Sequence, residues 1–155
     1  EVPAGSDRYG TLTDVLAVSV NGVRSQTALS VSAIAVDRYD AAVDDMASPD
    51  MELSKKFIKF GELKRGAEVE DSSVVLTNNG GGELIIRAVE FKNRALECSP
   101  KAGDRIAAGK SVPVTFRLST ADADYGVWVD RVRIITNDPA HPMQTLRVTA
   151  IVVEP

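Results

Sequence analysis

The sequence predicts an all-β fold in which two antiparallel sheets pack face to face as a sandwich. Three observations support this prediction. Apolar and polar residues alternate with a period of two through most of the chain. Signals for turns recur about every ten residues, as they do between the strands of a sandwich. No stretch shows the apolar spacing of a long amphipathic helix.

The first alternating segments predict a hairpin. Residues 9–20 and 27–36 each alternate, and Asn21-Gly22 lies between them, a dipeptide favoured in two-residue hairpin turns. The apolar residues on the alternating parities are Leu12, Leu16, Val18, Val20, Leu29, Val31 and Ala33. Because an isolated two-stranded hairpin is marginally stable in water, we expect another part of a protein to cover its apolar face.

Residues 37–50 differ in composition from the segments around them. They are acidic and rich in small residues, and Pro49 stands near their end. This composition is typical of a linker or a short helical turn. Oxygen ligands for calcium between two domains could come from Asp37, Asp40, Asp44, Asp45 and Asp50. Their spacing fits no calcium-binding loop, so a solvated linker is the favoured interpretation.

From Met51 onward strands dominate the prediction. Residues 53–63 contain two short extended pieces, around Phe57 and around Phe60-Gly61. Residues 69–78 lead into Gly80-Gly81-Gly82, where glycine permits the positive φ of a tight reversal, and residues 84–89 return. Three later segments place apolar residues on one parity: Val112, Val114, Phe116 and Leu118; Trp128, Val132 and Ile134; and Leu146, Val148, Ala150 and Val152.

The two ends of the chain resemble each other, which indicates tandem copies of one unit. Tyr9-Gly10 and Tyr125-Gly126 open similar runs, and residues 29–34 match residues 146–151. The predicted organisation is the C-terminal hairpin of a truncated copy (residues 1–36), an acidic linker (37–50) and a complete sandwich (51–155). Open strand edges recruit other strands. We therefore predict that residues 9–36 pair with a second molecule, pack on the complete domain, or exchange between protomers.

Five motifs follow one another in the second part of the chain. They are Phe60-Gly61, Leu-Thr-Asn-Asn-Gly at residues 76–80 with Leu84 and Ile86, residues 106–109, Tyr125-Gly126 with Trp128, and residues 136–142. In this order and spacing they resemble the bacterial immunoglobulin-like (Ig-like) domains of uncharacterised function that are common in Bacteroidetes. Those domains are akin to abnormal-spindle/hydin (ASH) domains and, more distantly, to major sperm protein.

The resemblance covers residues 51–155, with residues 9–36 as a partial second copy. It implies a sandwich of about seven strands, an exported or surface location, tandem arrangement, and no established catalysis. Many of these relatives carry paired cysteines after the third strand. This chain has Cys98 alone in that region, so the resemblance implies no redox or metal role here.

Composition excludes several classes of function. A net charge of −4 and a pI near 5.0 argue against a nucleic-acid-binding surface. No apolar run reaches the roughly 18 residues of a membrane span. A single cysteine cannot form an internal disulfide.

The residues that could carry chemistry favour structural interpretations. Cys98 and the sole histidine, His141, supply too few ligands for zinc and no evident nucleophile and base. His141 lies in a proline-flanked turn, and Gly80-Gly81-Gly82 precedes no phosphate-binding helix. Asp104, Asp122, Asp124 and Asp130 show no spacing that marks a catalytic pair. We therefore predict no enzyme, no catalytic residue, no cofactor and no metal site.

Aromatic residues are the remaining candidates for a binding surface. Phe91, Phe116, Tyr125 and Trp128 could form a platform for a glycan or peptide. Trp128 shares its parity with Val132 and Ile134, which favours burial, whereas Phe91 lies in a predicted loop and is the better candidate for exposure. The favoured function is a non-catalytic structural or protein-interaction module of a multi-domain exported bacterial protein. The alternative is a glycan-binding accessory module of a surface protein or secreted hydrolase.

Overall fold

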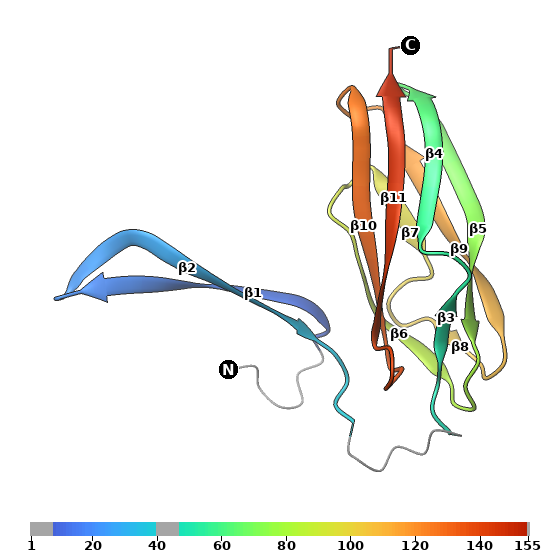
Figure 1. Cartoon of the computed structure of the whole chain (residues 1–155), viewed down its shortest axis with the longest axis horizontal. Helices are drawn as coiled ribbons and strands as arrows, with labels where there is room; N and C mark the ends of the chain where they lie inside the picture. Colours follow the sequence, from blue (N-terminus) through green and yellow to red (C-terminus); the bar gives the residue numbers. More distant parts are fainter. Residues whose placement is uncertain (1–7, 40–46, 155) are drawn as a thin grey trace.

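The computed structural model describes residues 8–39 and 47–154, which form a two-stranded hairpin followed by a β-sandwich (Figure 1). The hairpin pairs β1 (Gly10–Val20) with β2 (Val23–Ala35). No helix occurs among the described residues, in agreement with the all-β prediction. In particular, they include no helix of the length and apolar character that a membrane span requires.

The sandwich consists of a five-stranded sheet in the order β4-β11-β10-β6-β8 and a four-stranded sheet in the order β3-β5-β9-β7. Its strands are β3 (Met51–Leu53), β4 (Phe57–Lys64), β5 (Glu68–Asn78), β6 (Leu84–Glu90), β7 (Leu96–Ser99), β8 (Arg105–Ile106), β9 (Ser111–Ser119), β10 (Gly126–Thr136) and β11 (Met143–Val153). The Ig-like sandwich is therefore confirmed. It has more strands than the seven predicted, because short strands such as β3 and β8 carry too few residues to show an alternating pattern.

The start of the sandwich departs from the predicted antiparallel pairing. The chain first pairs β3 with β5 in one sheet and then crosses to the other sheet, where β4 lies parallel to β11. The two extended pieces predicted around Phe57 and around Phe60-Gly61 are thus parts of one continuous strand, β4. The register of β4 shifts near Phe60-Gly61, where Gly61 has a φ of 75°. Glycine adopts this conformation without steric cost, so the strand stays paired on both sides of the irregularity.

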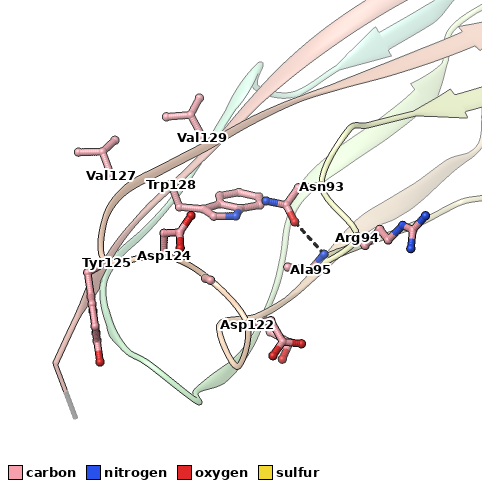
Figure 2. Close-up of a pocket in the computed structure, with 11 residues that line it drawn as sticks. Asn93, Arg94, Ala95, Asp122, Asp124, Tyr125, Val127, Trp128 and Val129 are labelled. Carbon is pink, nitrogen blue, oxygen red and sulfur yellow. Dashed lines mark hydrogen bonds between the residues drawn. The ribbon is translucent and has the colours of Figure 1, made fainter.

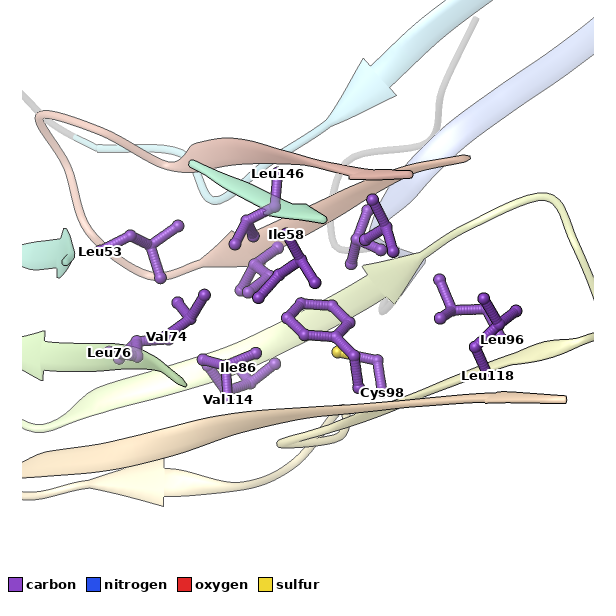
Figure 3. Packing of buried hydrophobic residues seen from close by; sticks show 14 of the residues in the cluster. Leu53, Ile58, Val74, Leu76, Ile86, Leu96, Cys98, Val114, Leu118 and Leu146 are labelled. Atoms are coloured by element: carbon purple, nitrogen blue, oxygen red, sulfur yellow. The ribbon is translucent and has the colours of Figure 1, made fainter. Parts of the chain in front are cut away.

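The interior between the sheets contains the apolar residues that the alternating pattern selected (Figure 3). Val114, Phe116 and Leu118 of β9 face Val132 and its neighbours on the opposite sheet, and all are fully buried. Phe91, predicted to be exposed, instead packs against this core half-buried. The core cluster contains residues from Met51 to Val152 and none from the hairpin. The sandwich therefore has the interior of an independently folding domain.

The glycine-rich reversal between β5 and β6 is held by the buried side chain of Asn78. Its amide nitrogen donates to the carbonyl oxygens of Gly82 and Ile106, at 2.8 and 3.0 Å. Its oxygen accepts from the backbone nitrogens of Asp50 and Gly80. None of these glycines has the positive φ that the sequence suggested. A Cβ at Gly80 or Gly82 would instead collide with the backbone of residues 47–50, so close approach is what requires glycine here.

The hairpin matches its prediction in geometry. Asn21 and Gly22 both have positive φ, as the two-residue turn requires. Beyond its base the hairpin extends away from the sandwich (Figure 1), and its apolar side chains are exposed, with Leu29 at 53% and Val31 at 50%. It therefore does not pack along the complete domain. The predicted pairing with a second molecule and the predicted exchange between protomers both stay predictions.

The acidic linker is only partly within the described residues. Asp40, Asp44 and Asp45 lie outside them. Asp37 does not behave as a solvated linker residue, because its carboxylate pairs with Arg87 of β6. The backbone of Asp50 bonds to the glycine-rich reversal. Both described acidic residues of this segment thus contact the sandwich.

Replacing Phe116 with alanine should lower the free energy of unfolding by about 3–5 kcal/mol, because it leaves a cavity at the centre of the interior. Phe57, on β4, is 55% exposed and provides the matched control. The Phe57→Ala change should alter the free energy of unfolding by about 0.5 kcal/mol or less. Urea unfolding followed by tryptophan fluorescence measures both. Equal effects of the two substitutions would contradict the assigned core.

Candidate functional site

Two places combine polar side chains with accessible surface: a pocket at one end of the sandwich and the contact between the hairpin and the sandwich. The pocket has a volume of about 660 Å³ and lies beside the start of β10 (Figure 2). Its lining includes Asn93, Asp122, Asp124, Tyr125 and Trp128. The structure thus brings two of the predicted carboxylates and two of the predicted aromatic residues to one surface.

Trp128 forms the aromatic wall of this pocket. The side chain is buried, as its parity predicted, and it belongs to the same core cluster as Phe116. The indole nitrogen of Trp128 is buried and has no hydrogen-bond partner among the described residues. Buried donors without a partner are uncommon in native proteins.

Asp130 holds the loop that borders the pocket. Its buried carboxylate accepts hydrogen bonds from the backbone nitrogens of Lys92, Asn93 and Arg131, with Asn93 at 2.7 Å. The side-chain oxygen of Asn93 in turn accepts from the backbone nitrogen of Ala95 (Figure 2). A carboxylate that accepts this many backbone hydrogen bonds orders the loop, which is a structural role.

Cys98 lies on β7 with its thiol facing the core. Burial raises the pKa of Cys98 to about 12. A thiol with this pKa stays protonated near neutral pH and is a poor nucleophile. His141, the sole histidine, lies in the turn between β10 and β11 and offers no base on the cysteine's strand.

His141 belongs to a cluster that the sequence did not reveal. Asp50, Asp138 and His141 place one ligand atom each within 4.8 Å of one another. The buried carboxylate of Asp138 already accepts from the backbone nitrogens of Met51 and Ala140, both at 2.8 Å, and from that of His141. Those bonds fasten the β10–β11 turn to the start of β3. The cluster is therefore explained by the turn itself.

The hairpin is attached to the sandwich by a compact polar contact, which we call the joint. It comprises Tyr9, Gly10, Thr11 and Asp37 from the hairpin and Arg87, Glu90 and Arg133 from β6 and β10. Arg87 is at its centre: its Nε donates to Asp37 at 2.8 Å, and its guanidinium carbon lies 5.0 Å from the centre of the Tyr9 ring. The Tyr9 hydroxyl donates to the second oxygen of Asp37 at 2.7 Å.

The pKa shifts at the joint favour the charged form of Arg87 and the neutral form of the neighbouring Tyr39. Burial by itself would lower the pKa of Arg87, but the hydrogen bond and negative charge of Asp37 raise this pKa overall. The pKa of the adjacent Tyr39 is also raised, first by burial and then by the charges of Asp37 and Asp138. At neutral pH Arg87 is therefore a guanidinium cation and Tyr39 a neutral phenol.

Glu90 makes the second set of contacts in the joint. Its carboxylate accepts from the backbone nitrogen of Thr11 at 2.6 Å and from the Thr11 hydroxyl at 2.8 Å. Arg133 donates to the same hydroxyl at 3.1 Å. Gly10 is buried with a φ of 94°, and a Cβ there would collide with the Glu90 carboxylate. The positive φ therefore favours glycine at this position, and a side chain there would also displace the Glu90 carboxylate.

Sequence reasoning missed the joint because its halves are far apart in the chain. Asp37 was grouped with the other acids of residues 37–50, although its partner is Arg87 on β6. The available signal was the repeated Tyr-Gly dipeptide at residues 9–10 and 125–126, which marks a position where backbone conformation and close approach matter.

Comparisons with known proteins match this architecture. Residues 49–151 match a family model described as the HYDIN/CFA65/VesB-like Ig-like domain. A solved structure of a protein of unknown function from Porphyromonas gingivalis is 25% identical, covers 97% of this chain and 69% of its own, and superposes with a TM-score of 0.72. That coverage includes the hairpin as well as the sandwich. No curated protein sequence matches the chain.

Two further structures share the sandwich. The ASH/PapD-like domain of human CEP192 is 14% identical, covers 79% of this chain and 99% of its own, and has a TM-score of 0.55. The Vibrio cholerae VesB protease is 15% identical, covers 67% of this chain and 32% of its own, and has a TM-score of 0.50. At these identities the likeness establishes the fold, and it agrees with the predicted resemblance to ASH domains.

Removing the charge at the centre of the joint should release the hairpin. We expect Arg87→Gln to increase amide hydrogen exchange and protease cleavage at the base of the hairpin, because Asp37 then loses its ion pair and Tyr9 loses its stacked cation. The melting temperature of the sandwich should change little. Arg105→Gln is the matched control, since Arg105 pairs with Glu83 at an exposed site away from the joint. Hairpin exchange that is equal in the two variants would show that the joint does not restrain the hairpin.

Proposed function

Since the chain belongs to the HYDIN/CFA65/VesB-like family of Ig-like domains, we propose that it is a non-catalytic structural and protein-interaction module. In this proposal it is part of a multi-domain exported bacterial protein built from Ig-like units in tandem. The extracytoplasmic location rests on the resemblance to exported bacterial domains. Among the described residues, the chemistry-bearing groups found are explained by turns, loops and core packing, which supports a role without catalysis.

One observation carries the proposal: the hairpin has the register of the last two strands of the sandwich but lacks the facing sheet. Leu16 pairs with Leu29 as Val132 pairs with Leu146. In the sandwich this pair is buried against β9 and β5, whereas in the hairpin both leucines are half exposed. A face with this pattern is stable only when other strands cover it.

We infer that the remaining strands of a preceding Ig-like unit cover the hairpin in the multi-domain protein. The same face and the two open edges of β1 and β2 would recruit a second molecule when the chain is isolated, through strand addition or exchange of residues 9–36. Exposed apolar residues occur on both faces of the hairpin, and Val15 and Ile34 belong to the second face. Both faces therefore favour association with protein.

A second candidate function is saccharide binding in the pocket beside β10. The observation that favours it is the pocket itself, which brings Asn93, Asp122 and Asp124 together with Tyr125, whose ring is exposed. Aromatic faces and hydrogen-bonding carboxylates are the groups that bind sugars. A glycan array followed by calorimetry tests this function. Binding that is lost in Tyr125→Ala and retained in Tyr9→Ala would support it, and an array without signal would reject it.

We predict that the isolated chain self-associates through the hairpin. Light scattering after gel filtration should give a mass that rises with concentration toward a dimer. Val31→Asp should restore the monomer, because it places a charge in the apolar face. The matched control is Thr13→Asp, which adds the same charge to an exposed polar position of the hairpin. A parent chain that stays monomeric at every concentration, with slow exchange of its hairpin amides, would contradict the proposal.

A further inference from the structure

The start of β10 and the end of β11 reproduce the half of the joint that the hairpin supplies. The registers of the two hairpins correspond, since Gly10 pairs with Ala35 as Gly126 pairs with Val152. When this correspondence is extended by one or two residues beyond the paired positions, every hairpin residue of the joint has an equivalent at the start of β10 or the end of β11. The matched pairs are Tyr9 and Tyr125, Gly10 and Gly126, Thr11 and Val127, and Asp37 and Glu154.

The two glycines share a conformation but differ in their surroundings. Gly10 has a φ of 94° and Gly126 a φ of 102°. At Gly10 the carboxylate of Glu90 occupies the space that a side chain would fill, whereas nothing lies within 4 Å of the equivalent point at Gly126. The backbone at Gly126 is thus arranged as in the joint, and the place of the glutamate is open.

The other three residues that correspond to the joint, Tyr125, Val127 and Glu154, are exposed. Val127 is 78% exposed, more than any other large apolar side chain in the described part of the molecule. Glu154 is exposed and retains the negative charge that Asp37 has in the joint. Tyr125 is 53% exposed, although the guanidinium of Arg65 already lies 5.2 Å from its ring centre. An exposed valine, an acid and a tyrosine thus stand at one end of the sandwich, each at the position that its counterpart has in the joint.

We propose that Tyr125, Gly126, Val127 and Glu154 form a terminal half-joint that docks a following Ig-like unit of the same tandem protein. That unit would present an arginine and a glutamate in the places of Arg87 and Glu90. Its arginine pairs with Glu154 and stacks on Tyr125, and its glutamate approaches Gly126 and accepts the backbone N–H of Val127. The inference rests on the proposed tandem organisation and adds the residues that join its units.

One contact differs between the joint and the half-joint, and this difference restricts which side chains the following unit can present. Thr11 accepts a hydrogen bond from Arg133 through its hydroxyl, which Val127 lacks. The following unit therefore gains no hydrogen bond at this point and needs an apolar group or an aliphatic stem against Val127. An arginine can supply that stem while its charged end remains in water.

A fused chain tests the proposal with the protein's own sandwich as the probe. Residues 1–154 are followed directly by a second copy that begins at residue 38, so that Glu154 takes the place of Asp37 before the same linker. The first copy, which contains the hairpin, carries Val31→Asp. This substitution removes association through the hairpin. Spin labels on the two sandwiches then report the distribution of distances between them. The expected result is one narrow distribution.

Three variants of the fused chain decide the outcome. Glu154→Gln in the first copy, or Arg87→Gln in the second, should replace the narrow distribution with a broad one. Glu154→Arg combined with Arg87→Glu in the second copy should restore it, because the pair is re-formed with reversed charges. Glu97→Gln, at an exposed position of β7, is the control and should leave the distribution unchanged. Melting curves verify that both sandwiches are folded.

A parent fused chain with a broad distribution, or one whose narrow distribution survives Glu154→Gln, overturns the half-joint. Neither result affects the proposed function, which is judged separately by the concentration-dependent mass of the unfused chain. The two proposals can also separate in the other direction. If the unfused chain is monomeric but the fused chain gives a narrow distribution that depends on Glu154, the half-joint is supported and association through the hairpin is rejected.

Discussion

The structure depends on one constraint, which is that the apolar faces of two sheets must exclude water together. Phe116 and Leu118 on β9 have no other place to bury, and Val132 and Val148 on the opposite sheet are in the same position. Burying such side chains contributes about 1.5–3 kcal/mol each. The buried polar residues mark where this interior ends: Asn78 and Asp138 use their hydrogen bonds to close loops over its edge.

The hairpin is the part of the molecule that does not satisfy this constraint. β1 and β2 are long, with 11 and 13 residues, and their pairing repeats that of β10 and β11. Their backbone hydrogen bonds are made, yet their side chains have no interior to enter. A hairpin of this kind is attached through its base, where the joint supplies an ion pair, a stacked cation and hydrogen bonds to Thr11 in place of apolar burial. The hairpin therefore points outward with its position fixed at one end.

The sequence predicted the features that depend on local order. Alternation assigned the buried faces of β9, β10 and β11, because a period of two is visible within a few residues. Asn21-Gly22 assigned its turn for the same reason. The sequence could not predict the crossing from β3 to the parallel pairing of β4, since that choice depends on which edge is free. The sequence also suggested a positive φ for Gly80 and Gly82, which they do not have. Glycine is required there because the backbone of residues 47–50 approaches closely. The joint escaped prediction because Asp37 and Arg87 meet only after the sandwich has formed.

The Tyr-Gly dipeptide shows how a local signal and a distant partner combine. A glycine at the start of a long strand weakens the strand, because it has no side chain to pack and more freedom to lose. Gly10 offsets this cost by admitting the Glu90 carboxylate, which then receives the backbone N–H of Thr11. The tyrosine before it provides the ring on which Arg87 stacks, and the acid at the end of the second strand completes the ion pair. At the base of the hairpin the dipeptide therefore serves contact with the sandwich, and the half-joint that we propose would use the same chemistry at Tyr125-Gly126.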